Sequence, residues 1–183
     1  MRLIETNIAG AWIIESKAFQ DNRGAFSRLF CTQDLQDIVN PRTIVQINHS
    51  KTHRVGAVRG MHFQSPPRAE MKIVRCLKGR VFDVAVDLRQ GSHTFLKWTA
   101  IELTPESNSA IVIPEGCAHG FQVLEEDSEL LYLHTMFYTP GIEGGIRFDD
   151  PIIGVKWPLL PIDLSSRDLS HPFLTKEFKG IVL

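Results

Sequence analysis

Several features that mark particular classes of protein are missing from this chain of 183 residues. No apolar run is long enough to span a membrane, because charged residues interrupt every such stretch. The first residues lack a basic region followed by an apolar core, so we expect no secretory signal. The three cysteines form no CxxC pair, which argues against structural disulfides and against a cysteine-rich zinc site. These absences predict a cytoplasmic protein.

An excess of charge of one sign is also absent. The chain has 20 basic and 21 acidic residues, which gives a formal net charge of -1. This balance predicts no nucleic acid and no membrane surface as partner, so individual Arg and Lys side chains would have to hold any anionic ligand. We find no repeat, no low-complexity segment and no Gly/Ser linker. We therefore expect one domain over residues 1–183.

The sequence does contain many short runs in which apolar and polar residues alternate. In Val81–Arg89 the even-numbered residues are apolar and point to one side of a strand, while Asp83, Asp87 and Arg89 point to the other. Lys78-Gly79 before this run is typical of a hairpin turn. Gly and Pro separate the other runs, which favours an all-β domain. We expect strands at 45–48, 57–64, 71–77, 81–89, 97–103, 110–113, 120–124 and 129–137.

Short strands spaced by turns, with 43% hydrophobic residues, favour a jelly-roll barrel. A short helix is expected at 35–39, near the N-terminus, and loops with short helical turns in the last thirty residues. Inward-facing residues of several strands would line a pocket in such a barrel.

Polar residues concentrate in four segments where a β domain normally places apolar ones. These segments are Arg59–Gln64, Lys72, Pro114–Gly120 and Tyr132. Each has an ordinary reading when taken alone, since a strand Lys usually faces solvent and a Tyr beside Leu usually belongs to the core. Together they supply a base, an acid and two cations, which is the set that one class of reaction needs.

The order and spacing of twelve segments resemble the dTDP-4-dehydrorhamnose 3,5-epimerase family, whose members are cupin-type jelly rolls. The segments are Asp21–Phe26, Gln46–Ser50, Arg59–Gln64, Lys72, Gly79–Arg89, Ile113–Phe121, Tyr132, Tyr138, Glu143, Asp149–Pro151, Trp157–Pro158 and Ser166–Asp168. The resemblance runs nearly end to end. It implies a cupin-type barrel, a nucleotide-sugar substrate and a homodimer in which N-terminal strands pair across the interface.

The resemblance also implies a role for each matching residue. His62 would be the general base, Asp168 the carboxylate that orients its ring, and Tyr132 the acid on the opposite face of the sugar. Lys72 and Arg59 would face the ketone oxygen, and Tyr138 would stack on the nucleotide base. The expected substrate contacts are Arg23, Phe26, Arg28, Gln46, Asn48, Arg59, His119, Tyr138, Glu143 and Arg167, with Arg23, His119 and Arg167 at the pyrophosphate.

The chemistry of these residue types agrees with that assignment. A carbon beside a ketone is acidic only because its anion spreads onto oxygen, so fixed cations must stabilise that oxygen. Histidine is the side chain whose ordinary pKa suits a base near neutral pH. Inversion needs a second proton carrier on the other face, and Tyr132 supplies one. No metal, nicotinamide or other cofactor is required by this scheme.

Strand parity raises two further points about the site. Tyr132 and His134 fall on one face of their strand, so His134 is a candidate to line the pocket. Arg59 and His62 fall on opposite faces of an ideal strand, and only a bulge or bend would bring both into one pocket.

Three positions depart from the family pattern. Arg28 stands where Glu is common, Cys117 where Phe is common, and Glu70-Met71 where Gln-Gly is frequent. The position of Arg28 contributes to nucleotide binding, so the identity of the nucleotide stays open.

Other functions also remain open. One is epimerisation at one carbon or 3,4-ketoisomerisation of a related nucleotide sugar. A metal-dependent cupin would need more ligands, because Gln64 stands where a second histidine of a His-x-His pair belongs. A non-catalytic sugar-binding cupin would be expected to have lost His62, Tyr132 or Asp168, and all three are present.

Overall fold

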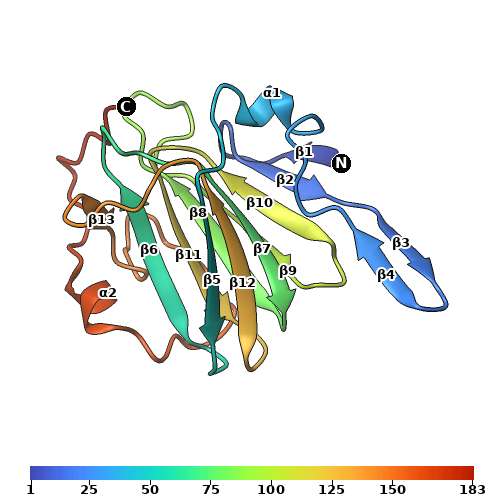
Figure 1. The fold of residues 1–183 in the computed structure, drawn as a ribbon. Coiled ribbons are helices and arrows are strands. Elements are labelled where there is room, and N and C mark those ends of the chain that lie inside the picture. The colour runs from blue at the N-terminus through green and yellow to red at the C-terminus, as the bar shows by residue number, and fades with distance from the viewer.

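Two antiparallel sheets face each other in the computed structural model, which describes residues 1–183 (Figure 1). The six-stranded sheet has the order β1 (Arg2–Glu5), β2 (Trp12–Glu15), β10 (Ser109–Ile113), β7 (Lys72–Lys78), β12 (Ser128–His134) and β5 (Gln46–Thr52). The five-stranded sheet has the order β13 (Glu143–Gly145), β6 (Val58–Gln64), β11 (Cys117–Val123), β8 (Val81–Asp87) and β9 (Trp98–Leu103). This arrangement confirms the all-β jelly roll.

Two short helices complete the fold near the ends of the chain. α1 spans Gln36–Val39 and α2 spans Ser166–Ser170, as the sequence predicted for these regions. No helix of the protein combines the length and the apolar character needed to cross a membrane.

All eight strands predicted from alternation are present, as β5 to β12. β5 extends further than expected, to Thr52, and β12 ends earlier, at His134. Alternation missed β1, β2, β13 and the two strands of a small hairpin, β3 (Ala18–Asp21) and β4 (Gly24–Ser27). Each of these has four residues or fewer, which is too short for a period of two to be recognised.

Strand β8 explains why polar groups reach the interior of the barrel. Its apolar face, with Val84 and Val86, packs outward against the C-terminal segment, including Trp157 and Phe178. Its other face therefore points between the sheets, where Ala85 joins the main core cluster. In a barrel with a solvated exterior, the apolar residues of a strand face the interior and the polar residues face solvent. Both faces of β8 are buried, and here the apolar residues face outward.

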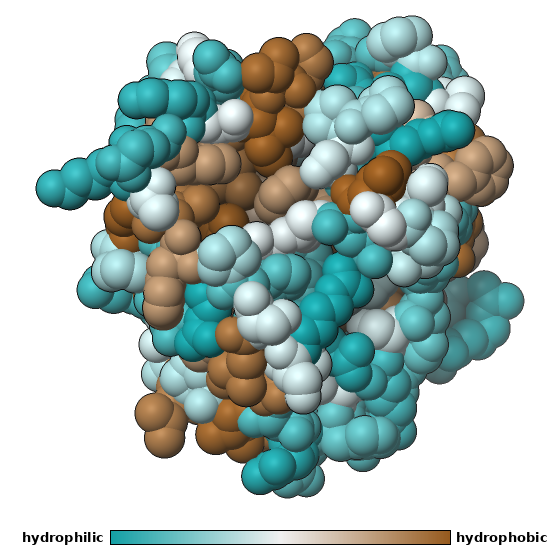
Figure 2. Space-filling model, turned by 90° about the vertical axis from the view of Figure 1, so that its left-hand side faces the viewer, coloured by the Kyte–Doolittle hydropathy of each residue, from teal (hydrophilic) through white to brown (hydrophobic).

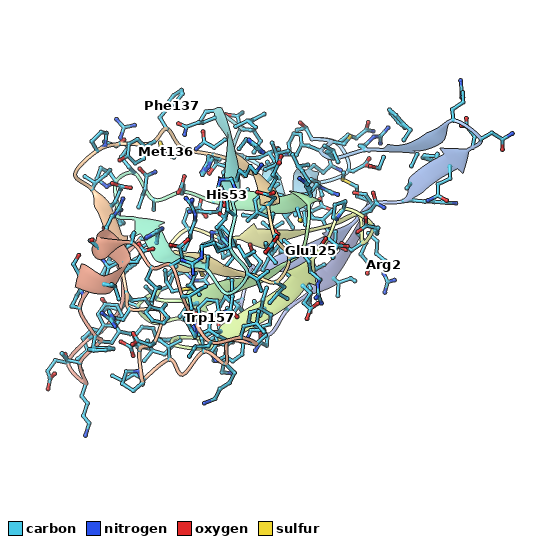
Figure 3. All side chains as sticks on the ribbon, turned by 90° about the horizontal axis from the view of Figure 1, so that it is seen from below. Arg2, His53, Glu125, Met136, Phe137 and Trp157 are labelled. Atoms are coloured by element: carbon cyan, nitrogen blue, oxygen red, sulfur yellow. The ribbon has the colours of Figure 1, made fainter.

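The β3–β4 hairpin projects away from the barrel (Figures 1 and 3). Phe19 and Phe26 are directly opposite each other on its two strands and are 65% and 73% exposed. An isolated two-stranded hairpin is at best marginally stable in water, and two exposed phenylalanines add an apolar surface. This hairpin is therefore the part of the molecule that most needs an additional packing partner.

Candidate active site

A cavity of about 560 Å³ opens between the two sheets. β5, β7 and β12 of the larger sheet form one wall, and β6 and β11 of the smaller sheet form the other. The residues that line it are Ile47, Asn48, His49, Ser50, Arg59, His62, Lys72, His119, Phe121, Tyr132 and His134. The cavity thus collects seven of the predicted site residues.

His62 and Asp168 meet although 106 residues separate them. The His62 Nε2 atom lies 2.6 Å from the Asp168 Oδ1 atom, and Asp168 is only 3% exposed. The other carboxylate oxygen accepts the Gly60 backbone N–H at 3.3 Å. Ser165 caps α2 by accepting the Asp168 N–H at 3.0 Å, which fixes the helix that carries the carboxylate.

Asp168 keeps its negative charge in this environment. Burial raises the pKa of its carboxyl, but the hydrogen bond and charge of His62 and the bonds from Gly60 and Ser165 outweigh burial and leave the pKa below its ordinary value. An ionised Asp168 can therefore stabilise a protonated His62 ring.

A β-bulge brings Arg59 and His62 to the same cavity. His119 pairs with His62 and Phe121 pairs with Arg59, so two steps along β11 match three steps along β6. Gly60 lies inside the bulge at φ +129°, and a Cβ atom there would stand 2.5 Å from the Cα atom of Gly120. Only glycine allows that approach. The bulge that strand parity required is therefore present.

Tyr132 lies on β12, across the cavity from His62 on β6. Its hydroxyl is 3.1 Å from the Ser50 hydroxyl on the neighbouring strand. Burial raises the pKa of the Tyr132 hydroxyl well above its ordinary value, an effect that the Ser50 hydrogen bond only partly offsets. The group therefore stays protonated at neutral pH and is available as a proton donor.

Lys72 and His134 form the part of the cavity wall next to Tyr132. The rings of Tyr132 and His134 are stacked with centroids 6.0 Å apart, as expected for residues on one face of a strand. Behind them, Glu70 binds Lys72 Nζ at 2.9 Å and His134 Nδ1 at 2.8 Å. Glu70 departs from the family pattern in the sequence, and its place behind the site was not predicted.

His119 and Asp83 form a buried pair in the cavity wall. The His119 Nε2 atom lies 2.9 and 3.0 Å from the two carboxylate oxygens of Asp83, and these residues are 6% and 0% exposed. One ring nitrogen of His119 is thus engaged within the protein, and its contact with a pyrophosphate stays a prediction. Asp83 was missed, although its place on the polar side of Val81–Arg89 was the available signal.

Four predicted substrate contacts form a hydrogen-bonded rim. Tyr138 donates its hydroxyl to Glu143 at 2.9 Å, and Glu143 also binds Arg167 at 2.9 Å. The Tyr138 backbone N–H donates to the Gln46 side chain at 3.0 Å. Tyr138 is half exposed, so its ring is available for stacking.

Figure 2 views the molecule from the side on which α2 and β13 lie in Figure 1 and shows hydrophilic and hydrophobic residues interspersed there.

Three predicted contacts lie outside the cavity of their own chain. Arg23 and Phe26 belong to the projecting hairpin, where Arg23 has an ion pair with Asp21 two residues away. Arg28 follows β4 and pairs with Asp34 at 3.1 Å. The structure therefore separates these three residues from the His62 cavity, and their binding role stays a prediction.

Gln64 does not serve as a ligand of the kind that a metal-dependent cupin needs, because backbone groups occupy both ends of its amide. Its amide nitrogen donates to the backbone carbonyls of Arg68 and Phe137, and its oxygen accepts the Thr139 N–H at 2.9 Å. A different group, His62, Asp168 and His171, has ligand-capable atoms within 4.8 Å of one another. In that group His62 and Asp168 are already hydrogen-bonded to each other.

A jelly roll with this cavity defines a cupin-type protein with an acid–base site. The sequence matches the model of the dTDP-4-dehydrorhamnose 3,5-epimerase family over residues 5–176. The chain belongs to this family.

Three similar proteins illustrate the range of the family. The dTDP-4-dehydrorhamnose 3,5-epimerase of Salmonella typhimurium is 42% identical, over 95% of this chain and 96% of its own. The structure of dTDP-6-deoxy-D-glucose-3,5-epimerase from Legionella pneumophila in complex with dTDP-4-keto-L-rhamnose has 37% identity and a TM-score of 0.89, covering 94% of this chain and 92% of the other. A 3′-monoepimerase from Streptomyces bikiniensis in complex with dTDP-quinovose has 33% identity and a TM-score of 0.84, covering 91% and 84%.

Proposed function

We propose that this protein epimerises a nucleoside-diphosphate 4-keto-6-deoxyhexose, with dTDP as the nucleotide, at C3, C5 or both. The observation that carries the proposal is the placement of the His62–Asp168 pair on one side of a cavity and Tyr132 on the other, with Lys72 and Arg59 also lining it. Membership in the dTDP-4-dehydrorhamnose 3,5-epimerase family supports the substrate class.

The first step is removal of a proton from a carbon next to the ketone. His62 takes this proton on a ring nitrogen, and the neighbouring Asp168 carboxylate stabilises the resulting imidazolium. The electron pair of the broken C–H bond moves onto the ketone oxygen and forms an enolate. Lys72 and Arg59 are the cations that line the cavity beside the expected position of this oxygen, and they stabilise its negative charge.

The second step returns a proton to the same carbon from the other face. Tyr132 donates its hydroxyl proton, and the enolate electron pair re-forms the C–H bond with inverted configuration. Between turnovers His62 releases its proton to solvent and Tyr132 regains one. This sequence of steps uses no metal and no nicotinamide.

The nucleotide is held at the rim in this proposal. The Tyr138 ring stacks on the base, and Arg167 binds a phosphate oxygen together with His119 and Arg23, because charged donors bind phosphate strongly. Gln46 and Asn48 contact the same ligand from β5.

We further infer that the protein, with residues 1–183 as one domain, works as a homodimer in the cytoplasm. The exposed Phe19 and Phe26 would be buried between subunits, and the Arg23 of one subunit would reach the cavity of the other. Cys31, Cys76 and Cys117 are free thiols, which suits a reducing compartment.

Incubation with dTDP-4-keto-6-deoxyglucose in heavy water, followed by NMR, tests the proposed activity. Deuterium at C3 and C5 of the inverted product indicates epimerisation at both carbons. Deuterium at one carbon of that product indicates a single-site enzyme, as the 3′-monoepimerase of Streptomyces bikiniensis is named. If no label enters dTDP, UDP, GDP or CDP forms of 4-keto sugars, the epimerase proposal is wrong.

A further inference from the structure

One buried carboxylate behind the cavity wall has no part in the steps described above. Glu70 lies just before β7, its side chain is 8% exposed, and it is not one of the residues that line the cavity. Removing an ionised carboxylate from water is costly unless the charge is paired and hydrogen-bonded. The partners of Glu70 therefore indicate what the charge is used for.

Both partners of Glu70 are cavity residues. One carboxylate oxygen binds Lys72 Nζ at 2.9 Å, and the other binds His134 Nδ1 at 2.8 Å. Lys72 and His134 are paired across β7 and β12, so a single carboxylate serves two adjacent positions of one wall. Burial raises the pKa of Glu70, but the His134 hydrogen bond and the Lys72 charge outweigh it and keep the group ionised.

The bond to Glu70 selects one tautomer of His134. An ionised carboxylate only accepts hydrogen bonds, so Nδ1 must carry the proton. Nε2 of the neutral ring is then an acceptor, and Asn48 Nδ2 donates to it at 3.3 Å. Asn48 Oδ1 accepts from Gln46 at 3.2 Å, and Gln46 in turn accepts the Tyr138 backbone N–H at 3.0 Å. Donors and acceptors alternate without conflict along the whole chain.

We propose that Glu70 is a positioning residue that fixes the Lys72 ammonium beside the ketone and connects it, through His134, Asn48 and Gln46, to the rim that binds the nucleotide. This inference rests on the proposed function, because it takes the role of Lys72 from it. Lysine is a point charge on a flexible stem, so one anchored N–H bond directs the remaining donors into the cavity. A bound nucleotide that orders Tyr138 and Gln46 thereby orders the lysine as well.

Two opposing effects follow from replacing Glu70 by alanine. Loss of the negative charge leaves Lys72 less neutralised, which alone would favour the enolate. Alanine, however, leaves Lys72 Nζ and His134 Nδ1 without their shared acceptor. A buried ammonium left unpaired is strongly disfavoured, and it moves away or loses its proton. We therefore expect displacement to outweigh the gain in charge.

Steady-state kinetics of Glu70→Ala test the inference. We expect kcat to fall by about 10- to 100-fold, the range for a displaced catalytic group, while KM changes by less than about threefold. Glu70→Asp keeps the charge and should retain more activity than Glu70→Ala. Asp127→Asn is the matched control, because Asp127 also bridges a lysine, Lys51, and a histidine Nδ1, that of His53, at a site outside the cavity. Its kcat should equal that of the unchanged protein.

The tautomer of His134 gives a second measurement. It uses the unchanged protein and requires no turnover. In ¹⁵N-histidine-labelled protein at pH 8, His134 should carry its proton on Nδ1 and leave Nε2 unprotonated. A proton on Nε2 would overturn the hydrogen-bonded chain. An active enzyme whose Glu70→Ala variant keeps its full kcat would overturn the positioning role. An unchanged protein without epimerase activity would instead refute the proposed function, and the NMR result would still stand on its own.

Discussion

The barrel cavity and the β3–β4 hairpin both carry residues predicted to contact the substrate, but their side chains are held in different ways. Behind the cavity wall, the side chains of Asp168, Asp83 and Glu70 are almost fully buried, and each binds a cavity residue far away in the sequence. On the hairpin, Arg23 is exposed and pairs only with its near neighbour Asp21. The cavity residues are preorganised by contacts within one chain, whereas Arg23 is paired only within its own hairpin.

The largest effect expected in the cavity is that of His62→Ala. The proton is then never removed, so both deuterium exchange and product formation should be lost. A general base contributes at least about 100-fold. NMR in heavy water measures both quantities. Deuterium exchange at the unchanged rate in this variant would show that another group is the base.

Tyr132→Phe distinguishes the proposed role of Tyr132 on one wall of the cavity from that of His62 on the other. The ring and its packing remain, but the proton donor is absent. His62 can still form the enolate and return a proton to the original face, so the variant should exchange label while making little inverted sugar. The measurement is the rate of deuterium exchange compared with the rate at which inverted sugar forms. Inversion at the normal rate would exclude the hydroxyl as the acid, and His134 would be the next residue to test.

Asp168→Asn should act on both turnover and stability. The imidazolium loses its anionic partner, so kcat should fall, though less than in His62→Ala. The folded-state pKa of Asp168 is lowered, so its stabilising contribution is present above its unfolded pKa and is lost as pH falls through the folded pKa. The free energy of unfolding of the unchanged protein should therefore exceed that of the variant by about 1–3 kcal/mol near neutral pH. This difference should shrink below pH ~3.8.

Thermal unfolding of both proteins between pH 3 and pH 8 measures the stability difference. A difference that stays constant down to pH 3 would contradict the linkage to Asp168 ionisation.

Arg23→Ala should have the smallest effect on chemistry. Loss of a charged hydrogen bond to phosphate should raise the apparent KM by about 10- to 100-fold and leave kcat nearly unchanged. Collapse of kcat with intact nucleotide binding would reassign Arg23 to the chemical step.

Mixed dimers test whether Arg23 on the hairpin acts in the cavity of the partner subunit. If Arg23 acts in the partner's cavity, a dimer of one Arg23→Ala and one His62→Ala subunit contains one complete site, with His62 from the first subunit and Arg23 from the second. Mixing the two variants should then restore turnover at the normal KM. Activity equal to the sum of the separate variants would show that Arg23 serves its own chain or that no dimer exchanges subunits. Co-purification of an untagged variant with an affinity-tagged one distinguishes these cases.

Side-chain alternation was enough to locate the central strands but not the edges of the molecule. Strands β5 to β12 are five to seven residues long, so their period is visible in the sequence. Strands β1 to β4 are too short, and the position of β2 depends on pairing with a distant strand, β10. The β3–β4 hairpin was not predicted; the resemblance implied only that N-terminal strands pair across a dimer interface.

The His62–Asp168 pair and the residues behind the cavity wall were predicted to different degrees. His62, Tyr132 and Asp168 were found because their types and order match a known pattern, and strand parity correctly required the bulge at Gly60. Asp83 was missed because alternation cannot tell which face of a strand lies inside a barrel whose exterior is also covered. Only the packing of the C-terminal segment decides that question. Glu70 was missed because it lies just before β7, where alternation gives no orientation.

The distance of 106 residues between His62 and Asp168 has a consequence for the newly made chain. At synthesis rates of 5–20 residues per second, the ribosome adds Asp168 about 5 to 20 seconds after His62. Once Tyr132 has been added, the growing chain contains the proposed base, acid and cations of the cavity, but not the carboxylate that orients the base. The His62 ring therefore acquires its buried partner only when α2 has been made and docked.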